Sequence, residues 1–287
     1  MVTITTFTDP MMGLSYESEP VFRRLETHYG TSVKFKYAMG LLVRDVYDFV
    51  NPADLASGKA VAIERYNTRL AKIYESEEAI SGMPINMQGF ALFDVEHTST
   101  LPLNLAFKAV ETFAPQLAEI FLYNLRYATI VDCRPTTHLD EILDVAHHIG
   151  IDRNQFLEVY NSGETEKHLL DDLRQMAYLG IHSLPAYLLE HEGHSVLVNR
   201  LIAYDEFVPI IGELTKGQLR PSAPQRSTDS VLDLMQRHPL LSPIEIREAF
   251  DFKTTDDVMQ FLQPLVKSGK TEIINVYHGQ FVKLKQE

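Results

Sequence analysis

Apolar and polar residues alternate at the start of the chain, and then the spacing of the apolar positions changes. Residues 2–9, VTITTFTD, alternate with period two and are rich in β-branched side chains, which predicts a strand. Apolar residues of 17–29 fall on one helical face, and Gly30 is suited to end that helix. Residues 32–39 alternate again. This β-α-β order predicts two parallel strands joined by a right-handed crossover.

The middle of the chain has helical spacing. In 44–80 and 101–180 the apolar residues recur three and four apart, without a comparable strand signal. Residues 185–190 and 194–199, separated by HEGH, then predict a β-hairpin, and 204–214 predict a helix. The order β-α-β, helices, β-β-α predicts an α/β fold: a thioredoxin-like core over 1–216 with a helical insertion at about 44–180.

The sequence predicts that the last quarter of the chain is a separate module. Residues 215–230 are rich in Pro, Gly, Ser and Gln, which predicts a linker, assigned to 217–227. Residues 228–287 then predict three helices and two short strands, with Ser242 and Pro243 starting the second helix. This order is typical of a winged-helix-like module. Asp256 and Asp257 open its third helix and would repel DNA, so the module is interpreted as a packing or protein-binding surface.

Composition and charge narrow the partners and the cellular location that we expect. The net charge is −13, of which residues 221–287, with 8 Lys and Arg against 9 Asp and Glu, carry only −1. Concentrated positive charge is therefore absent, and no nucleic-acid partner is expected. There is no basic leader or long apolar run, and Cys133 is the only cysteine. We expect a cytoplasmic protein without disulfides or membrane segments; the sequence does not indicate its oligomeric state.

The stretch FTDPMMGLSYESEP, residues 7–20, has the local frame of a thiol redox site without its sulfur. A strand leads through a turn into a helix start, where a thiolate would be stabilised. Met12 cannot ionise or form a disulfide. Ser15 has no neighbouring histidine to activate it, so we interpret it as a helix cap. Pro185, just before a strand, suits either a cis or a trans peptide.

Other candidate residues favour structural roles. The histidines considered as metal ligands lack the spacing and third ligand of known sites, so no metal site is predicted; they are His147, His148, His182, His191 and His194. No cofactor is predicted either. Arg134 could lower the pKa of Cys133, but a small buried residue is the favoured interpretation.

These residues together resemble the YjbH/SpxH family, DsbA-like cytoplasmic adaptor proteins of Gram-positive bacteria that are often labelled dithiol-disulfide isomerases. Four segments carry the resemblance: FTDPMMGLSYESEPVFRRLETHYG, LPLNLAFKAVE, SLPAYLLE and VYHGQFVKLK. By position, Met12 and Ser15 stand for the two family cysteines, Tyr16 for the following tryptophan, and Pro185 for the cis-proline. A related branch, the kappa glutathione transferases and chromene isomerases, has serine at the first cysteine position, where this chain has methionine.

The resemblance implies binding rather than catalysis. Such proteins present the redox regulator Spx to the ClpXP protease, which requires surfaces and no nucleophile. A DsbA-like oxidoreductase or isomerase, or a glutathione-using enzyme acting through Ser15, remains the alternative. We hypothesise an apolar shelf that binds a partner peptide by strand addition. Its members are Met11, Met12, Gly13, Leu14, Ser15, Leu184 and Pro185.

Overall fold

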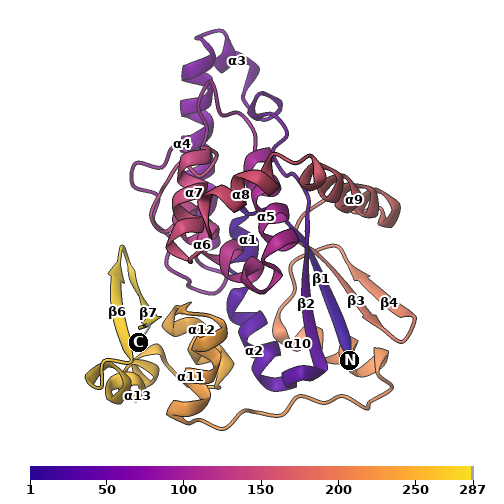
Figure 1. The fold of residues 1–287 in the computed structure, drawn as a ribbon, viewed down its shortest axis with the longest axis vertical. Helices are drawn as coiled ribbons and strands as arrows, with labels where there is room; N and C mark the ends of the chain where they lie inside the picture. The colour runs from indigo at the N-terminus through magenta and orange to yellow at the C-terminus, as the bar shows by residue number, and fades with distance from the viewer. Residues whose placement is uncertain (286–287) are drawn as a thin grey trace.

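The computed structural model, which describes residues 1–285, contains a four-stranded mixed sheet (Figure 1). Its strands are β1 (Val2–Thr8), β2 (Val33–Met39), β3 (Ala186–His191) and β4 (His194–Val198), in the order β2-β1-β3-β4. β1 pairs parallel with β2, with Val2 opposite Val33, and antiparallel with β3. This topology confirms the predicted β-α-β and hairpin parts of a thioredoxin-like core.

The helix predicted over 17–29 corresponds to α2 (Glu19–Tyr29), and a separate short helix precedes it. The short α1 (Gly13–Tyr16) follows the turn after β1, and α2 begins after a break at residues 17–18. α2 and α10 (Tyr204–Leu214) pack on the sheet through a buried cluster that includes Phe22, Tyr187 and Phe207. Pro20 near the start of α2 explains the break, because proline fits only the first turn of a helix.

The helical insertion is confirmed, and it packs around a core of its own. Its helices are α3 (Pro52–Leu55), α4 (Lys59–Glu77), α5 (Leu101–Phe113), α6 (Ala118–Ile130), α7 (Leu139–His148), α8 (Arg153–Tyr160) and α9 (Glu164–Leu179). α5 lies at the centre, where Leu103, Ala106, Phe107 and Val110 are fully or almost fully buried. Among the described residues, no helix combines the length and apolar content needed to cross a bilayer.

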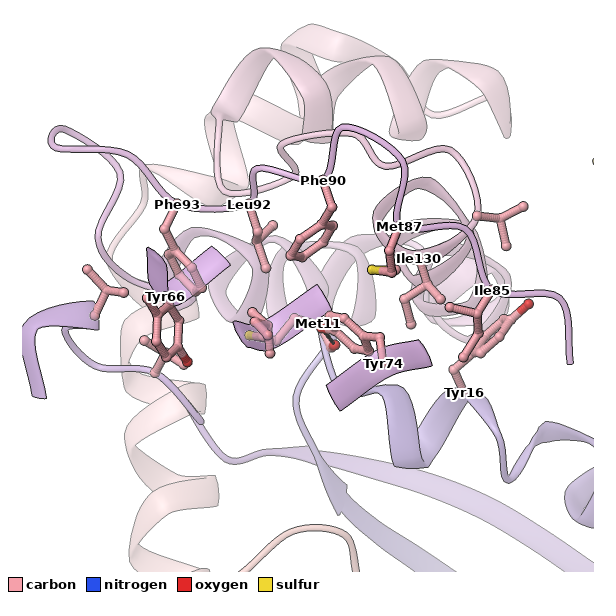
Figure 2. Close-up of a cluster of buried hydrophobic side chains, with 14 of the residues drawn as sticks. Met11, Tyr16, Tyr66, Tyr74, Ile85, Met87, Phe90, Leu92, Phe93 and Ile130 are labelled. Atoms are coloured by element: carbon pink, nitrogen blue, oxygen red, sulfur yellow. Dashed lines mark hydrogen bonds between the residues drawn. The ribbon is translucent and has the colours of Figure 1, made fainter. Parts of the chain in front are cut away.

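Between α4 and α5, residues 82–100 form a long segment without helix or strand. Its apolar side chains nevertheless point into the protein: Met83, Ile85, Leu92 and Phe93 are at most 4% exposed. Because the pattern has neither helical nor strand periodicity, the sequence gives no prediction for this segment. It closes one side of the region around Met11 and Tyr74 (Figure 2).

The C-terminal module contains the predicted elements and one additional strand. They are α11 (Thr228–Arg237), β5 (Leu240–Leu241), α12 (Pro243–Ala249), α13 (Thr255–Lys267), β6 (Thr271–Val276) and β7 (Gly279–Leu284). The strand order is β5-β7-β6, and β5, with two residues, is too short to leave a pattern. Ser242 and Glu245 form a capping box at α12. The winged-helix assignment stays a prediction, and the predicted module's last two residues lie outside the described chain.

The module lies against α2 of the thioredoxin-like core (Figure 1). The Thr27 hydroxyl donates to the Ala249 carbonyl at 2.7 Å, and Arg24 pairs with Asp251 at 2.9 Å. Residues 218–227, within the predicted linker, have no helix or strand, but the Ser222 amide donates to the His28 carbonyl at 2.9 Å. The two parts are therefore in direct contact; the proposed domain boundaries remain a prediction.

Candidate functional site

The turn after β1 is held by the carboxylate of Asp9, which is fully buried. One oxygen accepts the Met11 amide at 3.1 Å; the other accepts the Leu42 amide, the Thr100 hydroxyl and the Asn104 side-chain amide, each at 2.8 Å. Burial raises the pKa of Asp9, and these hydrogen bonds oppose the increase. Asp9 thereby fixes the turn before α1 to the helical insertion.

Met11 and Met12 lie at the start of α1, and both are buried. Met11 is 2% exposed and packs in the cluster with Tyr66, Tyr74 and Phe93 (Figure 2); Met12 is 7% exposed. The Tyr74 hydroxyl donates to the Met11 carbonyl. The prediction that the methionines form an adaptable apolar surface is therefore wrong, because the insertion covers Met11 and little of either side chain reaches solvent.

Helix α4 approaches α1 so closely that only glycine fits at position 13. A Cβ atom on Gly13 would lie 1.9 Å from Glu77 Oε2 and 2.6 Å from the Tyr74 ring. The segment 82–100 adds Ile85, Met87 and Phe90 to the same cluster, as Figure 2 shows above Met11 and Tyr74. A thiol site of this fold needs access for a second sulfur. Here the corresponding position is packed shut.

Ser15 is inside α1 and does not cap it. The N-cap of α1 is Met12, which makes no capping hydrogen bond, so the helix-cap interpretation of Ser15 is wrong. Ser15 is 1% exposed, and its Oγ lies 2.7 Å from the Thr8 Oγ1, which also accepts a hydrogen bond from Arg126 at 2.9 Å. A hydroxyl committed to this buried network is closed to glutathione.

The remaining members of the predicted shelf, Leu184 and Pro185, are joined by a cis peptide bond, as the resemblance implied. Pro185 is buried, while Leu184 is partly buried and packs against a cluster containing Phe7 and Ala38. Met11 belongs to a different cluster. The shelf is therefore not one apolar surface, and among its members only Leu14 and Leu184 are partly exposed.

Two carboxyl groups beside α1 were not found by sequence reasoning. Burial raises the pKa of Glu17 to about 8, although its carboxylate accepts hydrogen bonds from the Ser81 amide and hydroxyl. Burial also raises the pKa of Glu77 to about 7. A carboxyl group that stays protonated near neutral pH can act in catalysis. Glu17 is held by its hydrogen bonds to Ser81, and Glu77 lies in the close contact between α1 and α4, so both carboxyl groups have packing roles.

A buried ionic network lies where α2, α6 and the C-terminal module meet; we call it the Arg23 cluster. Arg23 is 1% exposed and pairs with Glu19 at 3.0 Å, Glu26 at 2.9 Å and Glu119 at 2.7 Å. Glu245 of α12 lies 3.6 Å from Arg23. The other members are Arg126, which pairs with Glu19, Tyr123, which donates to Glu245, and His238, which pairs with Glu26.

The lone thiol is no redox centre either. Burial, with the nearby Asp132 carboxylate, raises the pKa of Cys133 to about 11. Its Sγ donates to the Asn86 carbonyl at 2.7 Å, whereas Arg134 pairs with Glu141 and Asp144. The possibility that Arg134 lowers this pKa is therefore wrong, and Cys133 stays a protonated thiol at neutral pH.

The histidines considered from the sequence are not brought together with a third ligand in the part of the chain that the structure describes. His148 Nδ1 lies 3.5 Å from the Asp144 carboxylate, and His191 Nε2 lies 3.9 Å from the Glu192 carboxylate. A different set does converge: Asp94, His97 and His138. The separation of His97 and His138 in the sequence hid this set, since nothing in the pattern indicates that the two segments meet.

The comparison with known proteins can now be set beside this geometry. The family model described as Thioredoxin matches residues 5–208. The chain belongs to the thioredoxin family. Solved structures of this fold that resemble it include a putative protein disulfide isomerase from Nitrosomonas europaea, with 17% identity and a TM-score of 0.61, covering 76% of this chain and 98% of that one. A probable DsbA oxidoreductase from Streptomyces coelicolor has 14% identity and a TM-score of 0.56, covering 79% and 95%.

Curated relatives extend the likeness into the C-terminal module. The ClpXP adapter protein SpxH of Halalkalibacterium halodurans is 22% identical, covering 97% of this chain and 87% of its own length. SpxH of Bacillus subtilis is also 22% identical, covering 98% and 88%. The thioredoxin match ends at 208, so these alignments include residues of the module. The resemblance to the YjbH/SpxH family is confirmed.

Proposed function

We propose that this thioredoxin-family chain is a non-catalytic adaptor that binds a protein client and promotes its degradation by ClpXP. The observation that carries the proposal is the packed position at the start of α1, where Met12 and Ser15 replace a thiol pair and are 7% and 1% exposed. That position has no thiol, and its one hydroxyl, on Ser15, is buried. The similarity to SpxH adapter proteins along nearly the whole chain supports a role that depends on surfaces.

The client that the resemblance implies is a regulator of the Spx type, met in the cytoplasm of a Gram-positive bacterium. Of the hypothesised shelf, Leu14 and Leu184 are the members with partial exposure, so we propose them as its part that touches the client. No described group favours the thiol or the glutathione alternative.

Direct binding tests this function. Titration of the full chain with an Spx-type regulator should give a one-to-one complex whose affinity is unchanged by reductant, since no exposed thiol takes part. Leu14→Asp and Leu184→Asp should each weaken it, whereas Ser195→Asp, at an exposed position of β4, should not. Insulin reduction should stay at the rate of a Cys133→Ser variant. Absence of binding, or reduction above that rate, would contradict the proposal.

A further inference from the structure

Three side chains with metal-binding atoms converge outside the α1 region. Asp94 and His97 lie in the segment between α4 and α5, and His138 is the N-cap of α7. Their donor atoms all lie within 4.8 Å of one another. His97 Nδ1 is 3.0 Å from each carboxylate oxygen of Asp94, and His138 Nε2 is 2.9 Å from Asp94 Oδ2. Both imidazoles thus direct a nitrogen at one carboxylate.

The backbone on both sides of this group is fixed. The Glu96 and His97 amides each donate to Asp94 Oδ1 at 2.8 Å, and Asn67 exchanges hydrogen bonds with the backbone of Phe93 at 2.8 and 3.2 Å. On the other side, the Thr137 hydroxyl donates to the Leu92 carbonyl. The two histidine rings stack with their centroids 3.6 Å apart. The backbone that carries the three side chains is therefore held in place, and both rings already lie beside the carboxylate.

We propose that Asp94, His97 and His138 bind a divalent transition-metal ion of the zinc type. Two imidazoles and a carboxylate are ligands that zinc uses, at about 2.0–2.2 Å, which requires donor atoms roughly 3.3 Å apart. Small rotations of the three side chains would bring their donor atoms to this spacing. The side chains are 32–44% exposed, so an ion can enter, and a fourth position stays open to water.

The consequence is structural. The ion would link the irregular segment 82–100, which covers the packed start of α1, to the first turn of α7. Binding to the folded state alone raises stability through mass action. Magnesium, which prefers an octahedral set of oxygen ligands, does not fit a site with two imidazoles.

Equilibrium dialysis of the metal-free full chain against zinc tests this site. We expect one zinc ion per chain, no magnesium under the same conditions, and a higher melting temperature with zinc. His97→Ala and His138→Ala should each weaken binding at least tenfold, and Asp94→Asn should also weaken it while keeping the side chain's size. His147→Ala/His148→Ala, at the end of α7, is the matched control and should bind zinc as the wild type does.

Visible absorption of bound cobalt(II) tests the site in the wild-type chain, so the result does not depend on whether a variant folds. The wild-type chain with one equivalent of cobalt should show the intense visible absorption of a low-coordinate nitrogen–oxygen site. A wild-type chain that retains no zinc would overturn the proposal. So would a His97→Ala/His138→Ala variant, folded by circular dichroism, that binds zinc with wild-type affinity.

Discussion

At the scale of single residues, the backbone at the start of α1 follows the strand–turn–helix course of a thiol redox site, whereas its side chains are packed as in a protein core. The resemblance places Met12 and Ser15 at the positions of two family cysteines, and the burial around these residues is as important as their chemistry. Met11 contacts the insertion, Ser15 bonds Thr8, and Gly13 leaves no space beside Tyr74. Restoring the sulfur atoms alone should therefore not restore thiol reactivity.

This expectation can be measured with Met12→Cys/Ser15→Cys in a Cys133→Ser background. Both new thiols would be almost fully buried, so a thiol reagent should label them far more slowly than it labels the unfolded chain. Ser183→Cys in the same background, at an exposed position, is the control and should be labelled rapidly. Equal labelling rates in the folded state would show that the α1 region is open.

The raised pKa of Glu17 leads to a second prediction, on how the stability of the protein depends on pH. Its pKa is raised to about 8 in the folded state and is about 4.3 in an unfolded chain, so stability is full below about pH 4 and falls as pH rises toward 8. Glu17→Gln has no carboxyl group to ionise at this position, so it should not lose this stability as pH rises. The variant should gain stability relative to wild type between pH 5 and pH 8, on the order of 2 kcal/mol. Urea unfolding at both pH values measures the difference.

The exposed Glu75 on α4 supplies the control for this measurement. Glu75→Gln should shift the stability of the chain by similar small amounts at both pH values. A Glu17→Gln variant whose stability relative to wild type does not change with pH would contradict the account of the buried carboxyl group.

At the scale of elements, the closed site depends on α4 lying directly over α1. Gly13→Ala tests that contact, because its Cβ would lie 2.6 Å from the Tyr74 ring and closer still to Glu77. We expect a loss of about 1–3 kcal/mol in the free energy of unfolding, as for other overpacked positions. Gly212→Ala on α10 meets nothing within 4 Å and should be neutral or stabilising. Chemical denaturation of both variants decides between these outcomes.

Most helices and strands could be predicted, because the periodicity of apolar residues is a property of each segment by itself. Both strands of the β-α-β opening, the hairpin and the capped helix α12 formed as expected. The prediction failed where structure depends on distant partners. The segment 82–100 has no period, and its burial comes from Tyr66, Tyr74 and their neighbours. The exposure of the methionines could not be predicted for the same reason: α4 and this segment cover Met11 from far along the chain.

At the scale of the whole molecule, the Arg23 cluster joins three parts of the chain. Arg23 belongs to the thioredoxin-like core, Glu119 to the insertion and Glu245 to the C-terminal module. Burial raises the pKa of Glu245 to about 7, while the Arg23 guanidinium opposes the increase. Arg23 thus links the module to α2 and to the insertion through buried charges.

Arg23→Ala should therefore destabilise the protein strongly. It removes the buried guanidinium that Glu19, Glu26 and Glu119 share, and breaking buried ion pairs in this way costs about 3–5 kcal/mol. Arg24→Ala, one residue along and 28% exposed, removes a partly solvated pair and should cost no more than about 1 kcal/mol. Unfolding curves of the two variants measure this; equal losses would show that the cluster does not hold the module in place.

The central claim is that this chain promotes ClpXP proteolysis without thiol chemistry. The most direct test is the degradation rate of an Spx-type regulator by purified ClpXP, with no adaptor, with the wild-type chain, and with the Cys133→Ser variant that lacks any cysteine. The account predicts that both chains accelerate degradation equally, in reductant and after oxidation. A wild-type chain that leaves the rate unchanged, or an acceleration that vanishes in Cys133→Ser, would contradict it.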